Sequence, residues 1–281
     1  MTPMVSGAPP GIISVEGLRY VYEGADSPAL EGIDIEFSRG KSYALLGRNG
    51  SGKSTLARCL NGLIVPTAGR VVSCGHDTSR ETLSTEAARS VALVFQNPDT
   101  QLVGATVEEE VAFGPENLGL PSDRIRARVD EAMERAGVTD LAERQPHRLS
   151  QGQKQLVAIA GAIAMEPDFL VSDESTSMLD YSSRQRVLEL FEELRSSGMG
   201  IIHVTHFLEE AVTADEVVVL ESGAVAERGS PSSVLGNPER LRALGLEPLP
   251  VSVVTRELER IGHRLPRGVL TAGELVAWLY A

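Results

Sequence analysis

The chain has 281 residues, enough for one large domain with an appendage, and its hydrophobic fraction of 42% can build a substantial core. Its formal net charge of -13 argues against general nucleic-acid binding, because phosphate backbones are held by clustered lysines and arginines. Two cysteines, Cys59 and Cys74, lack the spacing of a metal site or a disulfide framework. This usage is typical of the reducing cytosol.

No segment has the length of a membrane span. The longest helix-like apolar stretch, residues 156–165, is about half of the ~20 residues that a spanning helix needs. Residues 1–11 are rich in proline and glycine and lack a signal-peptide pattern, so they predict a flexible N-terminal tail. Any work at a membrane would therefore need partners that supply the span.

In chain order, the first predicted elements are antiparallel strands at residues 12–22 and 33–37. Apolar runs then predict buried strands at residues 42–46, 91–95, 169–172 and 201–205. Helices are expected between the later strands. Ser122 is the expected N-cap of one helix, whose apolar or small positions are Ile125, Val129, Ala132, Met133 and Ala136. A second helix is marked by Val187, Leu190, Phe191 and Leu194.

Residues 47–55 read GRNGSGKST and match the full G-x-x-x-x-G-K-[ST] pattern between a predicted strand and a predicted helix. In such a loop the glycines let backbone N–H groups turn toward phosphate oxygens, and the helix N-terminus adds its positive dipole end. Lys53 would neutralise the β- and γ-phosphates, and Ser54 could ligate Mg²⁺. The residues expected to contact the nucleotide are Gly47, Asn49, Gly50, Ser51, Gly52, Lys53, Ser54 and Thr55.

A second cluster lies further along the chain. Residues 149–153, LSQGQ, open a helix-like segment with a serine and a glycine, which predicts another anion-binding helix N-terminus. Residues 169–174, FLVSDE, predict a buried strand that delivers Asp173 and Glu174 to its C-terminal edge. These motifs together indicate a nucleotide-hydrolysing site rather than a chance glycine-rich turn.

The order of the motifs resembles that of the ATP-binding cassette (ABC) family, with Walker A at residues 47–54, the signature at 149–153 and Walker B at 169–173. Smaller motifs match in the same order. These are the adenine-stacking aromatic Tyr22, the Q-loop Gln96, the D-loop SMLD at residues 177–180 and the switch His206. Each of them alone has an ordinary structural explanation, but their shared order and spacing are typical of the family.

This resemblance implies an α/β fold, a P-loop NTPase core of ABC type, with an antiparallel β subdomain and a helical signature subdomain. The ATPase domain would span residues 12–230, with its helical subdomain at about 97–165, and residues 231–281 would form a small C-terminal extension. That extension is proline-rich at first and then amphipathic at residues 251–261 and 271–280. It could pack on its own domain or contact a second ATPase subunit, and both interpretations stay open.

The family's mechanism buries ATP between two subunits, with the signature of one facing the Walker A loop of the other. By resemblance, Lys53 and a Mg²⁺ ion held by Ser54, Asp173 and Gln96 would offset charge on the γ-phosphoryl. Glu174 would polarise the attacking water and His206 would position it. The residues expected to reach the partner's nucleotide are Ser150, Gly152, Gln153 and Asp180.

Four positions depart from the usual family pattern. Gln151 replaces the first signature glycine, Leu156 replaces a common arginine, Ser175 replaces an alanine, and Tyr181 replaces a proline. None of them removes a catalytic group.

Within the family, residues 95–121 and 173–180 resemble ATPase subunits of energy-coupling factor (ECF) transporters. That implies uptake of a vitamin or a transition-metal ion at the cytoplasmic face of the membrane. The implied partners are a second ABC ATPase (a paralogue or a second copy), a transmembrane coupling protein and a substrate-binding membrane protein. The alternative is a soluble cassette ATPase of translation, repair or regulation, although the chain has one Walker A motif and no sustained heptads.

Residues 106–117 follow the Q-loop and carry a run of acidic residues, which are Glu108, Glu109, Glu110 and Glu116. By resemblance this segment meets the membrane partner, and we expect an acidic groove that receives basic side chains. The alternative is a solvated helix face.

Overall fold

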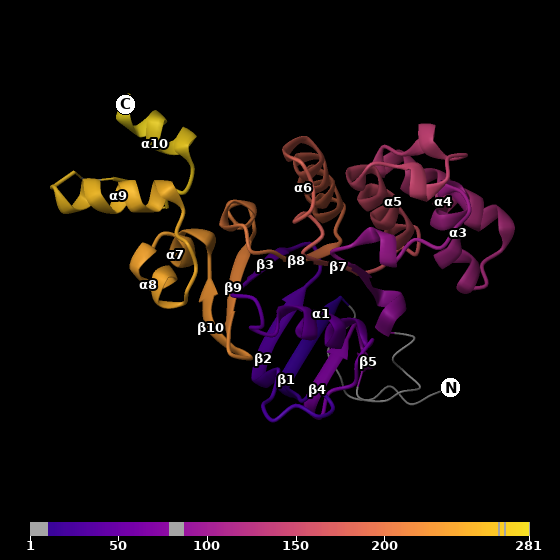
Figure 1. Ribbon diagram of the computed structural model, residues 1–281, viewed down its shortest axis with the longest axis horizontal. Helices are drawn as coiled ribbons and strands as arrows, with labels where there is room; N and C mark the ends of the chain where they lie inside the picture. Colours follow the sequence, from indigo (N-terminus) through magenta and orange to yellow (C-terminus); the bar gives the residue numbers. More distant parts are fainter. Residues whose placement is uncertain (1–10, 79–86, 264, 267, 281) are drawn as a thin grey trace.

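A computed structural model describes residues 11–78, 87–263, 265–266 and 268–280 (Figure 1). The N-terminal part contains a four-stranded antiparallel sheet in the order β2-β1-β4-β5. Its strands are β1 (Ile12–Tyr20), β2 (Leu30–Ser38), β4 (Ala68–Ser73) and β5 (His76–Asp77). The inward face of β1 and β2 is apolar at alternate positions, as expected for a sheet that covers a core on one side.

A second sheet has six strands in the order β10-β9-β3-β8-β7-β6. Five of its strands run parallel, and β10 is antiparallel at one edge. Their bounds are β3 (Ser42–Leu46), β6 (Val91–Val94), β7 (Phe169–Asp173), β8 (Gly200–Val204), β9 (Glu216–Glu221) and β10 (Ala224–Gly229). Both β7 and β8 are buried throughout, which is why their sequences are nearly continuous apolar runs. The carboxyl ends of β3, β7 and β8 meet at one edge.

Helix α1 (Lys53–Asn61) begins at that edge and packs against strands of both sheets. Its Leu56 and Leu60 belong to one buried core with Phe37 of β2 and Phe169 of β7. The packing holds the start of α1 beside the end of β7, and so it brings Walker A and Walker B together.

On the side of the six-stranded sheet opposite α1, α5 (Gln151–Ile163) packs against β6 and α6 (Tyr181–Ser196) packs against β8, while α3 (Val107–Asn117) and α4 (Ser122–Ala136) pack against α5. Helices α3, α4 and α5 pack on one another at one end of the molecule (Figure 1). Short 3-10 helices connect these elements, namely η1 (Pro98–Thr100), η2 (Thr139–Leu141), η3 (Pro146–Arg148) and η4 (Leu208–Ala211).

The C-terminal helices are α7 (Pro231–Leu235), α8 (Pro238–Ala243), α9 (Pro250–Arg260) and α10 (Ala272–Leu279). The first two share a core with β9, to which Leu235 and Leu241 contribute fully buried side chains. By contrast, α9 exposes Val254, α10 has no buried residue, and both lie far from α3–α5 (Figure 1). The extension thus has one packed half and one exposed half.

The strands predicted from the sequence are all present, within a few residues of their expected ends. The predicted helix N-cap at Ser122 is wrong: Pro121 occupies that position without a side-chain cap, and Ser122 is the first helical residue. A helix starts readily after a proline, whose φ is already set near the helical value. The expected tail, residues 1–11, lies outside the described residues except for Gly11. None of the described helices is long and apolar enough to cross a bilayer.

Candidate nucleotide-binding and hydrolysis site

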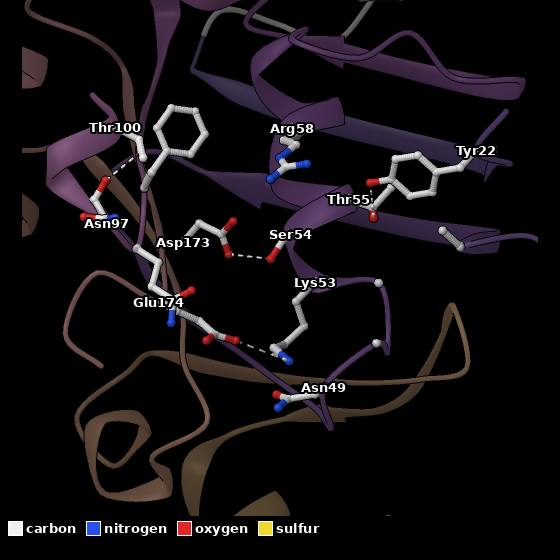
Figure 2. A pocket seen from close by; sticks show the side chains of 15 residues that line it. Tyr22, Asn49, Lys53, Ser54, Thr55, Arg58, Asn97, Thr100, Asp173 and Glu174 are labelled. Carbon is white, nitrogen blue, oxygen red and sulfur yellow. Dashed lines mark hydrogen bonds and ion pairs between the residues drawn. The ribbon is translucent and has the colours of Figure 1, made fainter. Parts of the chain in front are cut away.

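A cavity of about 630 Å³ opens at the carboxyl edge of the six-stranded sheet (Figure 2). The predicted site residues that line it are Tyr22, Asn49, Gly50, Gly52, Lys53, Ser54, Thr55, Gln96, Asp173 and Glu174. They come from four separate segments of the chain. The fold therefore assembles one site from motifs that are far apart in sequence.

The Walker A loop is shaped by glycines with left-handed backbones, since φ is 147° at Gly47, 80° at Gly50 and 103° at Gly52. A Cβ on Gly52 would lie 2.6 Å from the carbonyl oxygen of Ala29, so a side chain there would displace the loop. Ser51 is buried behind the loop and does not line the cavity, and its hydroxyl has no hydrogen-bond partner.

The N-terminus of α1 has no side-chain cap, because its N-cap residue is Gly52. The first N–H groups of a helix have no intrahelical partner, so here they remain available to an anion. Lys53 reinforces this: its buried Nζ donates to the carbonyls of Gly47 at 2.8 Å and Arg48 at 3.1 Å. Burial lowers the pKa of Lys53, and the nearby Glu174 and Asp173 oppose that shift. The loop fits the phosphates of a nucleoside triphosphate.

Ser54 and Asp173 meet across the cavity, where the serine hydroxyl donates to Asp173 Oδ1 at 2.8 Å (Figure 2). Burial raises the pKa of Asp173, while the Ser54 hydrogen bond opposes the shift. Gln96 lines the same cavity and donates to the Ser177 hydroxyl at 3.1 Å. A hydroxyl, a carboxylate and a carboxamide oxygen are hard ligands, so this set fits Mg²⁺.

Glu174 directly follows β7 in a left-handed backbone conformation with φ of 52°. Non-glycine residues adopt this conformation at an energetic cost, and such strain is concentrated at functional sites. The carboxylate lies between the Lys53 ammonium group and the His206 ring, 3.8 Å from Lys53 Nζ and 3.8 Å from His206 Nδ1. His206 is half-exposed beyond Glu174 and does not itself line the cavity.

Tyr22 lies on the rim of the cavity, just after β1 (Figure 2). Its hydroxyl is 3.1 Å from Thr55 Oγ1, and Tyr20 packs edge-on against its ring. Tyr22 is 40% exposed, so its aromatic side chain is accessible for stacking.

The signature residues and Asp180 do not line this cavity. Ser150 and Gln153 form a complete capping box at the start of α5. Gly152 is buried, and a Cβ there would lie 2.2 Å from Ser183 Oγ in α6, so the glycine permits close helix packing within the chain. Asp180 caps α6 by accepting from the Ser183 backbone at 2.9 Å; that bond and the Ser182 and Ser183 hydroxyls lower its pKa to about 2.

The departure at Gln151 has a local explanation. Its amide donates to Asp99 Oδ2 at 3.3 Å, and Lys154 Nζ lies 2.5 Å from the other oxygen of the same carboxylate. The Lys154 bond and then the Gln151 bond hold the pKa of Asp99 below its ordinary value. Asp99 belongs to η1, just beyond Gln96, so Gln151 links the signature helix to the Q-loop in a way that glycine could not.

Glu110 does not contribute a free carboxylate to the acidic groove expected on α3. Glu110 is buried, and its Oε2 accepts from the backbone N–H groups of Val103 and Gly104, both at 2.6 Å. Glu109 accepts from Ala105 at 3.1 Å, and Glu108 pairs with Arg126. A carboxylate that accepts backbone N–H bonds holds a loop, and a charge run in sequence cannot reveal this.

Further cavity residues were not predicted from the sequence, namely Ala29, Arg58, Phe95, Asn97 and Thr100. Arg58 had a readable signal, because it lies four residues after Ser54 and therefore on the same face of α1. The others lie in loops that only the tertiary structure brings to the cavity.

An uncapped helix N-terminus, a buried lysine, a hydroxyl–carboxylate pair and a strained glutamate in one cavity define a P-loop nucleoside triphosphatase. The profile of the ABC transporter family matches residues 30–177. The energy-coupling factor transporter ATP-binding protein EcfA1 of Symbiobacterium thermophilum is 51% identical over 272 residues, which cover 94% of this chain and 95% of that protein.

Solved structures agree with the sequence relatives. CbiO1 from Clostridium perfringens, described as part of the ABC transporter complex cbiONQ, has a TM-score of 0.75 and 36% identity, covering 89% of this chain and 99% of that one. The ATP-binding cassette MJ0796, solved as a dimer bound to ADP and Pi, has a TM-score of 0.70 and 26% identity, covering 78% and 98%. The chain belongs to the ABC transporter family, among the energy-coupling factor ATP-binding proteins.

Proposed function

We propose that this chain is the ATP-binding and ATP-hydrolysing subunit of an ECF-type ABC importer that takes up a vitamin or a transition-metal ion. The observation that carries the proposal is the cavity in which Lys53, Asp173 and Glu174 meet, within a chain related to ECF ATP-binding proteins over nearly its whole length. The cargo would be bound by a membrane partner, since ECF transporters separate cargo binding from ATP hydrolysis.

The residues expected to carry the chemistry have the following proposed roles. The α1 N-terminus and Lys53 bind the phosphates, and Tyr22 stacks on the adenine. Ser54, Asp173 and Gln96 hold Mg²⁺, which supplies charge neutralisation at the γ-phosphoryl when it is bound. Glu174 orients and polarises the attacking water through its carboxylate, and His206 steadies that carboxylate from the other side.

We propose a second cassette as the direct partner, either a paralogue or a second copy. Support comes from the placement of Ser150, Gly152, Gln153 and Asp180 outside the chain's own cavity, so the chain does not use them at its own nucleotide site. The related cassette MJ0796 was itself solved as a dimer. Exposed apolar residues of α9 and α10, among them Val254 and Val276, make the C-terminal extension a second proposed contact.

We also propose that the chain lies at the cytoplasmic face of the membrane as a peripheral subunit. A transmembrane coupling protein and a substrate-binding membrane protein would complete the transporter. Purification of the tagged chain in mild detergent should recover small hydrophobic membrane proteins. Recovery of the chain with no membrane protein would instead favour the soluble cassette ATPase.

The Glu174→Gln variant tests hydrolysis. The substitution keeps the size and hydrogen bonding of the side chain but removes the carboxylate, so turnover should fall by roughly 10²-fold or more. ATP affinity should stay within about threefold, because the phosphate-binding groups are unchanged. Steady-state hydrolysis by purified transporter and equilibrium ATP binding measure the two quantities. Near-normal hydrolysis by the variant would refute the assignment of Glu174.

A further inference from the structure

We propose that Glu210 is a positioning residue that ties the segment after Walker B to the segment that carries His206. The proposal rests on the proposed roles of Glu174 and His206. Glu210 belongs to η4, outside every motif discussed above, and its side chain is 3% exposed. A carboxylate so deeply buried is costly unless it is fully paired, so its partners report what it holds in place.

Three donors converge on Glu210 Oε2. Thr205 Oγ1 lies at 2.5 Å, His203 Nε2 at 2.8 Å and Thr176 Oγ1 at 3.0 Å. Burial opposes ionisation of this carboxyl, but the hydrogen bond and charge of His203 and the two threonine hydroxyls hold its pKa below the ordinary value. One oxygen atom thus joins residues from two separate strand ends.

The first branch reaches the switch histidine. The Thr205 hydroxyl donates to Glu210 and also accepts from the backbone N–H of Phe207 at 3.0 Å. These bonds bracket His206, whose ring lies against Phe207 with centroids 4.1 Å apart. Since the His206 side chain is half-exposed, the Thr205–Glu210 pair sets the backbone from which it projects.

The second branch reaches the D-loop. Thr176 lies two residues after the strained Glu174, and Arg184 of α6 donates to the carbonyl of Leu179 at 3.4 Å. The Arg184 guanidinium also lies 4.1 Å from the centroid of the Phe207 ring. Arg184 therefore contacts both the D-loop and the switch segment, while Glu210 contacts the switch segment and Thr176, which directly precedes the D-loop.

The link between those two side chains is incomplete. Arg184 Nε and Glu210 Oε1 are 3.6 Å apart, and neither buried atom has a hydrogen-bond partner. A shift of α6 by a few tenths of an ångström would close this pair. Because α6 begins directly after the D-loop, a partner that presses on the D-loop would change the Arg184–Glu210 contact and, through Thr205, the position of His206.

A third branch includes one of the departures from the family pattern. Ser175, where an alanine is common, lies with its hydroxyl 2.5 Å from that of Ser172. Ser172 in turn contacts His203 Nδ1 at 3.1 Å. The network therefore extends without a break from the residue after Glu174 to the residue before His206.

The prediction that follows is specific to turnover. None of Glu210, Thr176, Thr205 or Arg184 lines the cavity, so their loss should leave ATP affinity unchanged. The purified transporter that contains this chain should be assayed with Glu210→Gln, Thr205→Val and the double variant. We expect each single change to lower kcat about tenfold, with Kd for ATP within about threefold of the wild-type value. In the double variant, kcat should be no more than about twofold lower than in the single variants, because both changes break the same network.

Matched controls separate positioning from stability. Glu216→Gln removes a partly buried carboxylate of β9 that pairs with Arg228 of β10, and it should leave kcat within about twofold. Thermal unfolding of every variant is recorded, since a purely structural role would lower Tm while kcat of the folded protein stayed normal. If Glu210→Gln does not fold, Thr176→Val and Thr205→Val form the same test, because each removes one hydroxyl with little change of shape.

The role of Glu210 would be overturned if kcat did not change, or if the two single losses of kcat multiplied in the double variant. It would also be overturned if Kd for ATP rose by the same factor by which kcat fell. A wild-type protein without ATPase activity, or a normal Glu174→Gln variant, would instead overturn the proposed function. The two failures are thus distinguishable.

Discussion

Two helix N-termini in this protein were predicted to face phosphate, and the structure prepares them in opposite ways. Helix α1 has Gly52 as its N-cap residue and therefore no side-chain cap, so its first N–H groups open into the cavity. Helix α5 starts at Ser150 with a complete capping box, in which Gln153 N–H donates to the serine oxygen and Gln153 Oε1 accepts from Ser150 N–H. The first N–H groups of α1 are thus available to an anion, whereas the capping box already pairs the Ser150 and Gln153 N–H groups at the start of α5.

The difference shows how each end can bind an anion. At α1 the backbone itself is the ligand, so the loop must have no side chains in the way. At α5 the Ser150 hydroxyl uses its oxygen as an acceptor for the cap, which leaves its proton for a phosphate. We therefore expect the start of α5 to bind a phosphate through the Ser150 hydroxyl, which its capping box holds in place. The following substitutions test this contrast.

The largest effect is expected at Gly52. An alanine there would be forced to φ of 103° and would place its Cβ 2.6 Å from Ala29 O. Strain of roughly 1–2 kcal/mol and overpacking of roughly 1–3 kcal/mol should raise Kd for ATP by about a hundredfold or more. Isothermal titration measures this. Gly24→Ala is the control, because Gly24 also has a positive φ but an added Cβ there has nothing within 4 Å. An equal rise of Kd for ATP in both variants would contradict the role of close packing at Gly52.

Tyr22→Ala tests the rim of the open site. Loss of a stacked aromatic ring costs roughly 1–3 kcal/mol in nucleic-acid systems, so Kd for ATP should rise several-fold to about a hundredfold. Tyr22→Trp should be mild, because it keeps an aromatic face. If Tyr20→Ala weakens binding and Tyr22→Ala does not, the stacking residue is the other tyrosine of the pair.

Gly152→Ala should act through packing inside the chain rather than through nucleotide binding. Its Cβ would meet Ser183 at 2.2–2.6 Å, which should displace the start of α5 and lower hydrolysis by about tenfold while Kd for ATP stays unchanged. Gly273→Ala is a matched control, since Gly273 is also the second residue of a helix but has nothing within 4 Å. The Ser183→Gly change should restore part of the activity, and a failure to restore any would point to the partner's nucleotide as the obstacle.

The smallest effect is expected for Gln151→Gly. The change removes one exposed hydrogen bond to Asp99, worth roughly 0.5–1.5 kcal/mol, so hydrolysis should change by less than about tenfold. Lys154 still holds Asp99 in the variant. A large increase in hydrolysis would mean that Gln151 naturally weakens the signature and that a paralogue supplies the stronger site.

Motifs carried by contiguous residues could be predicted from the sequence. The glycine-rich loop, Lys53 and Ser54 form a local unit, and the apolar runs before Asp173 and His206 identify buried strands whose ends meet at one sheet edge. The strands β4, β5, β9 and β10 were missed, although the run of valines in β9 was a readable signal for a buried strand. Its neighbour β10 is only partly buried and lacks such a run.

What the sequence determined by itself was the set of chemical groups for binding and hydrolysis, because spacing along one loop or one strand fixes their local geometry. Only the tertiary structure decided which polar groups are already occupied within the chain. Glu110 was read as a surface charge and is buried against a loop, while Gly152 was read as a phosphate contact and packs on Ser183. Glu210 belongs to no motif, yet it joins Thr176 and Thr205 from different strand ends. The reason is physical: a hydrogen bond between residues distant in sequence produces no periodic pattern in that sequence, because it depends on how the sheets and helices pack around it.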